Sequence, residues 1–335
     1  MRFCVVILAF GFFLGGGVCV LAQDPNTAET IRIDTRLVSV PVIVSDRNGR
    51  YVPNLTAADF TVLQDGVPQQ IEFFGAVEEP LTIALLIDTS HSTRPVLDDI
   101  KDSARSFIKL LTPKDRAMVV AFDYGVHVLS PLTSDQEQLK KAIKTAEIPD
   151  MFGTMLRDAA FQTIDRSFAG IKGRKAVIIL TDGKDVGSRI SSPELLYALQ
   201  ETDTLIYTVM FKTGVGQAGM RPMQFPGGVI SRRFPLPPIR RDNPRRNDRA
   251  GRVNEAAEDF LQQMSDVSAG RFFSSKDGKL KNTFASIVEE LRFQYRLGFY
   301  PPEETGEKTL HEIRVKVART ETVVRSRGSY RIQSK

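Results

Sequence analysis

Residues 81–92 read LTIALLIDTSHS, and this stretch sets the fold class. Its first seven residues form a continuous apolar run that ends at Asp88. Such a run predicts a strand buried on both faces, as in a parallel sheet that helices cover on both sides. Short runs of the same kind recur at 117–122, 176–180 and 204–210.

Amphipathic stretches at helical spacing separate and follow these runs. They lie at 96–111, 136–145, 155–168, 193–199, 253–267 and 280–291. Residues 271–274 have the short apolar pattern of an edge strand. Alternation of strands with helices predicts an α/β fold with a doubly wound, mostly parallel sheet.

The flanks of this region have β character instead. Valines alternate strictly at 38, 40, 42 and 44, and the runs 60–63 and 70–74 predict a hairpin around Asp65-Gly66. Near the carboxyl terminus, 294–300, 311–317 and 322–325 also alternate. We expect the two flanks to pair, so that an α/β domain at 80–292 is inserted in a small antiparallel β-sandwich formed by 30–78 and 293–333.

The amino terminus has the layout of a secretory signal peptide. Met1 and Arg2 precede a stretch of apolar residues and glycine that ends at Ala22, and polar residues follow. We expect residues 1–22 to be removed and the protein to be exported to the periplasm, the cell envelope or the medium. The alternatives are an uncleaved membrane anchor, because the stretch could span a bilayer, and a lipoprotein acylated at Cys19.

Positive charge is concentrated in one segment. The 335 residues carry a net charge of +5, yet 221–252 holds nine arginines against two aspartates. That excess of seven charges leaves −2 for the rest of the chain. Six prolines lie there too, so we expect an irregular excursion over 213–252. It is either a solvated loop or an arm that contacts anionic surfaces; an exported chain is not expected to bind nucleic acid.

Polar side chains collect where the predicted strands end. Asp88, Ser90 and Ser92 follow the first strand, Thr154 lies in a later loop, and Asp182 follows the strand at 176–180. The carboxyl ends of parallel strands share one edge of a sheet, which is where ligands bind. Carboxylates and hydroxyls suit a hard cation such as Mg²⁺. With three His and two Cys, both cysteines within residues 1–22, the chain has few ligands for transition metals.

This pattern resembles a known family. Asp-x-Ser-x-Ser at Asp88, Ser90 and Ser92, then Thr154 and the Asp of Thr-Asp-Gly at Asp182, is similar to the metal-ion-dependent adhesion site of von Willebrand factor A domains. The resemblance covers about 81–291. The alternating valines before the domain, and 295–301 with 313–317 after it, resemble the VWFA-related domain family described from Acidobacteria.

The resemblance implies binding rather than turnover, with no catalytic residue. Ser90, Ser92 and Thr154 would bind Mg²⁺, with Mn²⁺ or Ca²⁺ as alternatives, while Asp88 and Asp182 would hold the metal and its waters. A Glu or Asp carboxylate of a partner protein would complete the coordination. The expected function is therefore that of an exported, non-enzymatic protein that binds a partner through the metal.

Each motif residue also has a simpler interpretation. The serines and Thr154 could cap helices, and Asp182-Gly183 could be an ordinary turn. His127 is expected to be a strand residue rather than a ligand, and Lys184 and Asp185 to be solvated. His91 lies between the two serines, but neighbouring residues rarely face each other as a catalytic pair does.

Two other functions remain open at this stage. One is a structural or assembly module of the cell envelope that a metal merely stabilises. The other is a hydrolase that resembles phosphatases of the haloacid dehalogenase type, which also carry an aspartate after the first strand. Those enzymes need a second carboxylate two residues later for acid–base catalysis, and this chain has Ser90 there.

Overall fold

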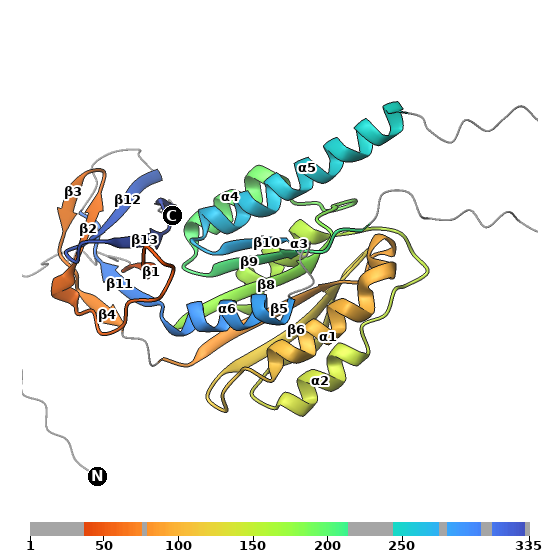
Figure 1. The fold of residues 1–335 in the computed structure, drawn as a ribbon, viewed down its shortest axis with the longest axis horizontal. Helices are drawn as coiled ribbons and strands as arrows, with labels where there is room; N and C mark the ends of the chain where they lie inside the picture. The colour runs from red at the N-terminus through yellow and green to blue at the C-terminus, as the bar shows by residue number, and fades with distance from the viewer. Residues whose placement is uncertain (1–36, 76–78, 214–243, 275–279, 303–309, 332–335) are drawn as a thin grey trace, which may run out of the picture. The chain divides into compact units, whose positions relative to one another are not determined.

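The computed structural model describes residues 37–75, 79–213, 244–274, 280–302 and 310–331. A six-stranded sheet with the order β10-β9-β8-β5-β6-β7 lies at the centre of the larger α/β part (Figure 1). Neighbouring strands are parallel except for β7, which pairs antiparallel with β6. The strands are β5 (Leu81–Asp88), β6 (Arg116–Phe122), β7 (Val126–Thr133), β8 (Arg174–Thr181), β9 (Leu205–Met210) and β10 (Arg271–Ser274).

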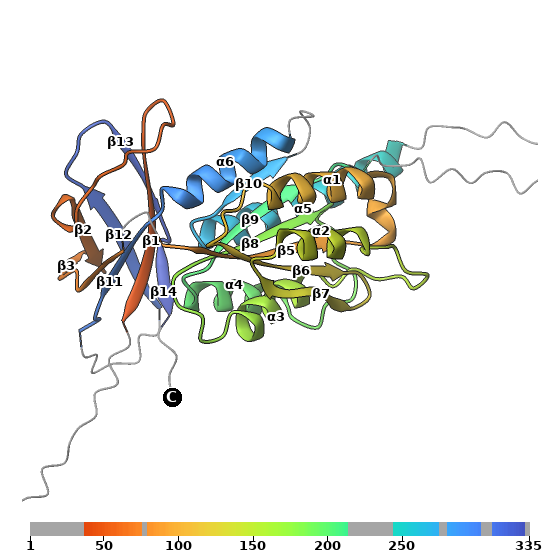
Figure 2. The same ribbon diagram turned by 90° about the horizontal axis from the view of Figure 1, so that it is seen from below.

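Helices cover both faces of this sheet (Figures 1 and 2). Side chains of α1, α2 and α6 pack on one face, and side chains of α3, α4 and α5 pack on the other. Figure 2 shows α1 and α6 on one side of the sheet and α3 and α4 on the opposite side. The helices are α1 (Leu97–Ile108), α2 (Gln136–Lys144), α3 (Leu156–Gln162), α4 (Ser192–Glu201), α5 (Pro244–Val267) and α6 (Leu280–Arg292).

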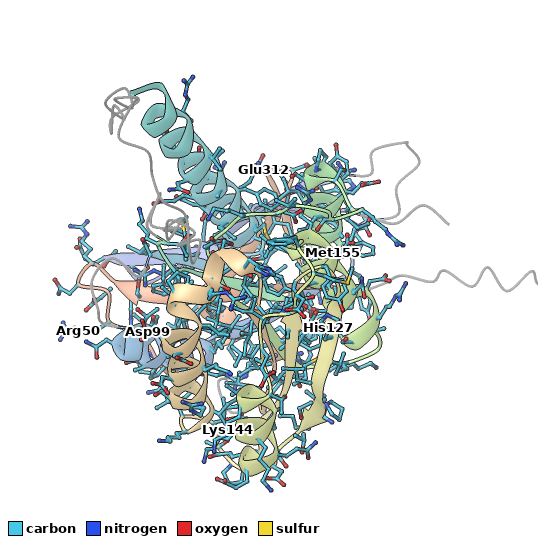
Figure 3. All side chains as sticks on the ribbon, turned by 90° about the vertical axis from the view of Figure 1, so that its right-hand side faces the viewer. Arg50, Asp99, His127, Lys144, Met155 and Glu312 are labelled. Carbon is cyan, nitrogen blue, oxygen red and sulfur yellow. The ribbon has the colours of Figure 1, made fainter. Side chains whose placement is uncertain are left out.

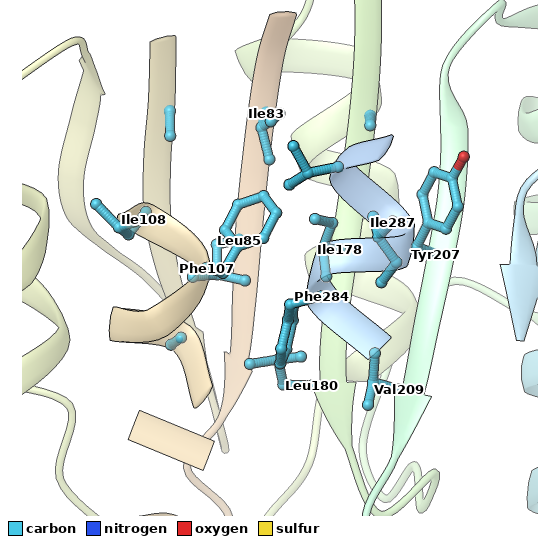
Figure 4. Close-up of a cluster of buried hydrophobic side chains, with 14 of the residues drawn as sticks. Ile83, Leu85, Phe107, Ile108, Ile178, Leu180, Tyr207, Val209, Phe284 and Ile287 are labelled. Atoms are coloured by element: carbon cyan, nitrogen blue, oxygen red, sulfur yellow. The ribbon is translucent and has the colours of Figure 1, made fainter. Parts of the chain in front are cut away.

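The apolar run at 81–87 explains the central position of β5. All eight residues of the strand are buried. Ile83 and Leu85 face the core beneath α1 and α6, where Phe107 and Phe284 pack with ring centroids 5.7 Å apart (Figure 4). Ala84 and Leu86 face the opposite core. A strand with helices on both sides is apolar at nearly every position, as β5 is, and the predicted α/β fold class is confirmed.

The amino- and carboxyl-terminal strands form two further sheets, of four strands each. Their orders are β13-β1-β11-β4 and β14-β12-β2-β3, and the alternating valines of β1 pack in their shared core. The strands are β1 (Val38–Asp46), β2 (Phe60–Gln64), β3 (Val67–Gln69), β4 (Phe73–Gly75), β11 (Tyr295–Phe299), β12 (Leu310–Val317), β13 (Thr322–Ser326) and β14 (Ser329–Arg331).

The pairing of the two flanks is the pairing that the sequence predicts. β1 lies antiparallel to β11 and β13, and β2 lies antiparallel to β12. The chain therefore enters the α/β part after strand β4 and re-enters the sandwich at strand β11. These two strands pair with each other.

Two sequence predictions about local structure were wrong. The hairpin around Asp65-Gly66 closes with β3, not with 70–74, because both turn residues have positive φ (49° and 85°) and bring the chain back at once. Residues 73–75 belong to the other sheet. Within the excursion expected at 213–252, helix α5 begins at Pro244, since proline is well suited to the first position of a helix. Residues 214–243 lie outside the described residues.

Buried polar contacts join the sandwich to the α/β part. The Glu290 carboxylate on α6 accepts hydrogen bonds from the hydroxyls of Tyr51 (3.2 Å) and Tyr207 (2.6 Å), and it pairs with Arg325 of β13. Arg327 donates to the Thr202 carbonyl, at the end of α4 (2.9 Å). Groups like these are costly to bury without partners, so they fix the contact geometry. No helix among the described residues is both long and apolar enough to cross a membrane.

Gly270 permits the close approach of β10 to β9, which gives a test of the fold. A Cβ atom there would lie 1.9 Å from the carbonyl oxygen of Ile206, in the backbone of the neighbouring strand β9. We expect Gly270→Ala to lower the free energy of unfolding by about 1–3 kcal/mol, as overpacking does. Urea unfolding measures this change.

Gly328→Ala is the matched control, because a Cβ at Gly328 has no heavy atom within 4 Å. Its free energy of unfolding should stay within about 0.5 kcal/mol of wild type. Equal destabilisation by the two substitutions would contradict the packing of β10 against β9.

Candidate metal centre

Three segments meet at the carboxyl ends of β5 and β8. The first follows β5 and the second follows β8, which is the neighbour of β5 in the sheet. The third segment contains Thr154, whose backbone exchanges two hydrogen bonds with Val186 (2.9 and 2.8 Å). The sheet and this short bridge therefore bring the predicted residues to one edge of the α/β part.

Asp88 is the buried centre of this arrangement. Its carboxylate is 0% exposed and accepts hydrogen bonds from the Ser90 backbone N–H (2.9 Å) and the Thr181 hydroxyl (2.6 Å). Burial and, to a smaller extent, the nearby negative charge of Asp182 raise the pKa of Asp88 to about 7. Hydrogen bonds from Ser90 and Thr181 oppose this rise without cancelling it.

The two serines lie together on the loop that follows β5. Their hydroxyl oxygens are 3.1 Å apart. Thr93 fastens the loop by donating its hydroxyl to the carbonyls of Asp88 (3.0 Å) and Ser90 (2.8 Å). Ser90 precedes a 3₁₀ helix, His91–Val96, but its side chain makes no capping hydrogen bond. Capping therefore does not account for the Ser90 hydroxyl.

Asp182 is 2% exposed and already has a cationic partner. The Lys184 ammonium and the Thr213 hydroxyl (2.9 Å) both donate to its Oδ2. The expectation that Lys184 is solvated is therefore wrong. The same expectation for Asp185 is also wrong, because its carboxylate accepts a hydrogen bond from the Arg157 backbone N–H (2.9 Å). The sequence signal for this ion pair was the position of Lys184 two residues after Asp182. The turn at Gly183 brings the Lys184 ammonium back to the Asp182 carboxylate.

Thr154 is positioned by its backbone. Its side chain is buried at 4% exposure, and its position is set by the backbone bridge to Val186. Among the described contacts its hydroxyl has no hydrogen bond to Asp88, the serines or Asp182. Met155, not Thr154, occupies the position before α3, so helix capping does not explain this threonine either.

Asp123, which the sequence did not single out, ties these loops together. Its carboxylate accepts from the Thr89 hydroxyl (2.9 Å) and lies 2.9 Å from Nε2 of His127, which is in strand β7 as expected. Its backbone carbonyl accepts from the N–H of Met155 (2.8 Å). Asp123 thus links the loop after β5 to the loop that carries Thr154. Its position at the end of β6 is the only sequence signal for this role.

An aromatic pair borders the site. The ring of His91 stacks on the ring of Phe152 with centroids 4.1 Å apart, and Phe152 is 81% exposed. Among the described residues His91 makes no hydrogen bond to Ser90 or Ser92, as a catalytic pair would require. Figure 3 looks toward this end of the α/β part, where Met155 and His127 are labelled.

The donor set fits a hard divalent cation. Two buried carboxylates and the hydroxyls of two serines gather where the charges of Asp88 and Asp182 repel each other. Such ligands suit Mg²⁺, which binds through one or two carboxylates and keeps several waters. No group of three or more His, Cys, Asp or Glu side chains in the described part of the chain could hold a metal ion. A metal here would depend on the hydroxyls.

The raised pKa of Asp88 predicts how stability changes with pH in metal-free buffer. The folded protein keeps a proton on Asp88 up to about pH 7, whereas the unfolded chain releases it near the ordinary aspartate pKa of 3.8. Stability therefore falls as pH rises between these values and levels off above them. Urea unfolding at about pH 5 and about pH 8 measures the fall, which we expect to be of the order of a few kcal/mol.

Asp88→Asn should remove this fall, because the amide cannot ionise yet can still accept from Ser90 and donate to Thr181. The same substitution at the exposed Asp99 of α1 is the control and should keep the wild-type dependence. The explanation is wrong if Asp88→Asn and wild type lose stability equally between the two pH values.

The solved structures that resemble this chain do so at low sequence identity. No curated protein matches the chain. Among solved structures, BatB from Bacteroides thetaiotaomicron is 17% identical and covers 63% of this chain and 98% of its own, with a TM-score of 0.46. The mussel byssus protein PTMP1 with a zinc-occupied MIDAS motif is 16% identical. The match covers 72% of this chain and 50% of PTMP1, with a TM-score of 0.47.

A von Willebrand factor type A protein from Catenulispora acidiphila is 13% identical and covers 82% of this chain and 72% of its own, with a TM-score of 0.47. The sequence model of the von Willebrand factor type A domain matches residues 83–184. That match runs from β5 through Asp182 and so encloses all five candidate residues. The chain therefore carries a von Willebrand factor type A domain.

Proposed function

We propose that this protein is exported and binds a partner protein through a divalent cation, without catalysing a reaction. The observation that carries the proposal is the burial of Asp88 beside Asp182 at the edge of the sheet, with serine hydroxyls next to them. Two carboxylates buried together favour a bound cation, because their mutual repulsion and lost hydration are then offset.

Each of the five residues has a specific role in this proposal. Ser90, Ser92 and Thr154 would provide neutral oxygen ligands, while Asp88 and Asp182 would hold the cation and its waters. A bound Mg²⁺ retains much of its positive charge when its direct ligands are neutral, so it attracts a carboxylate from outside. The partner would therefore present a Glu or Asp side chain.

The remaining parts of the chain have proposed roles as well. The α/β domain spans 80–292 and the sandwich is formed by 30–78 and 293–333. Residues 1–22 would direct export, and the arginines of 221–252 would contact anionic surfaces. Residues 1–36 and 214–243 lie outside the described part of the chain.

Metal binding is the first test of the proposal. Mg²⁺ and Mn²⁺ are titrated by calorimetry into residues 23–335, as wild type and as the Asp88→Ala and Ser90→Ala variants. We expect both substitutions to weaken binding by at least about tenfold, because each removes an oxygen ligand or its support. The exposed Asp99→Ala and Ser134→Ala are matched controls outside the site and should bind as wild type does. Absence of binding in the wild type would count against the metal site.

A peptide-binding experiment distinguishes two functions of the bound metal. In one, the metal binds a carboxylate of a partner protein; in the other, it only stabilises an envelope module. Mn²⁺ bound to the protein speeds the relaxation of water protons, because water exchanges at the metal. A peptide containing one Glu should lower this effect by displacing water, whereas the same peptide with Gln should not. Equal responses to the two peptides would favour the structural module.

Lys184 should weaken metal binding. Its ammonium holds Oδ2 of Asp182 and would lie close to the dication. We expect Lys184→Gln to tighten Mg²⁺ binding by about three- to tenfold, because one repulsive charge is lost in a partly buried setting. Lys212→Gln is the control, since Lys212 pairs with Glu258 instead (3.2 Å). Calorimetric titration measures both; weaker binding in Lys184→Gln would mean that Lys184 positions Asp182 rather than competing for it.

A further inference from the structure

A cleft between helices α1 and α2 has a composition that the metal site does not explain. Its volume is about 520 Å³, and the two helices lie side by side (Figures 1 and 3). None of the five candidate metal residues lines it. The lining residues are Asp102, Arg105, Ser106, Lys109, Glu137, Lys140, Lys141 and Lys144.

The lining residues form one stripe on each helix. On α1 and its carboxyl end they occur at 102, 105, 106 and 109, and on α2 at 137, 140, 141 and 144. Both sets have the spacing i, i+3, i+4 and i+7, which places side chains on a single helix face. Seven residues of helix span about 10 Å. Two rows of that length therefore face a common space.

The cleft is strongly basic. Five cationic side chains line it against two carboxylates. Each carboxylate is paired within its own helix, Asp102 with Arg105 and Glu137 with Lys140 (2.8 Å). In the described part of the chain, Lys109, Lys141 and Lys144 form no ion pair. An excess of three positive charges is thus left without a protein partner.

Helix dipoles account for part of this pattern. Arg105 is in the last turn of α1, and Lys141 and Lys144 are in the last turn of α2, where cations are favoured. That effect acts along each helix axis and is independent of the side chain's direction around it. It does not explain why the cations of two helices turn toward the same cleft, where they repel one another.

We propose that this cleft binds a ligand that carries at least two phosphate groups. Lysine ammonium groups on flexible stems bind phosphate as point charges and tolerate varied geometry. The volume is that of a small-molecule site, and each row of lining side chains extends over about 10 Å of helix. The phosphates could belong to a soluble molecule or to lipid headgroups. The proposal is independent of the metal site.

Inorganic tripolyphosphate is the probe for the phosphate chemistry. It is titrated by calorimetry into the purified protein in metal-free buffer, so that no cation links it to Asp88. The test variant replaces Lys109, Lys141 and Lys144 by Gln. The control variant replaces Lys114, Lys172 and Lys316 by Gln, which removes the same charge at exposed positions elsewhere.

We expect the test variant to bind tripolyphosphate at least about tenfold more weakly than wild type, and the control variant to change less than about twofold, because distant charges are screened. Tripolyphosphate should also slow acetylation of Lys109, Lys141 and Lys144 in the wild type, but not of the three control lysines. Equal weakening in the two variants, or no protection from acetylation, would overturn the proposal. Asp88→Ala should leave tripolyphosphate binding unchanged.

Vesicles identify the source of the phosphate. Vesicles of phosphatidylglycerol in phosphatidylcholine are sedimented with each variant. If wild type and the control variant sediment but the test variant does not, and tripolyphosphate releases the wild type, the cleft binds lipid headgroups. If the cleft binds tripolyphosphate but vesicle sedimentation does not depend on Lys109, Lys141 and Lys144, the ligand is a soluble phosphate compound.

Discussion

The carboxylate of Asp88 is buried completely at the end of the central strand, beside a second buried carboxylate, and the rest of the site is arranged around that constraint. β5 and β8 pair in parallel register with Ile87 opposite Leu180, so Asp88 and Asp182 must emerge at the same edge. Their repulsion has to be offset by nearby donors or a cation. Ser90 and Thr181 donate hydrogen bonds to the Asp88 carboxylate, and the Lys184 ammonium pairs with the Asp182 carboxylate.

A second layer of contacts holds these groups in place. Asp123 binds Thr89 through its carboxylate and Met155 through its carbonyl, so it links the loops on either side of the site. At the other end of the domain, Glu290 on α6 joins two tyrosines and Arg325 of the sandwich. Sites that bind with precision need rigid support of this kind. The von Willebrand factor type A domain is thus held between polar contacts at both ends of its sheet.

Sequence patterns predicted a strand correctly where its burial constrains successive residues along the chain. Full burial of β5 leaves an uninterrupted apolar run, and the packing of one face of β1 in the sandwich core leaves alternating valines, so both strands could be recognised. The strand at 70–74 was misplaced because residues 73–75 pair with β11, more than 200 positions away, and nothing local signals that partner. Helix α5 begins at Pro244, within a segment where prolines and arginines suggested irregular structure; one proline is compatible with the first turn of a helix.

The sequence by itself determined the fold class and the edge of the sheet at which Asp88, Ser90, Ser92 and Asp182 lie, because strands and their ends can be recognised from local patterns. Only the tertiary structure decided that Lys184 neutralises Asp182, that Asp123 joins the loops, and that the basic stripes of α1 and α2 face one cleft. These contacts depend on the turn at Gly183, on bridges between loops and on the rotation of each helix about its axis. Those geometries arise from packing of distant segments and leave no periodic signal in the chain.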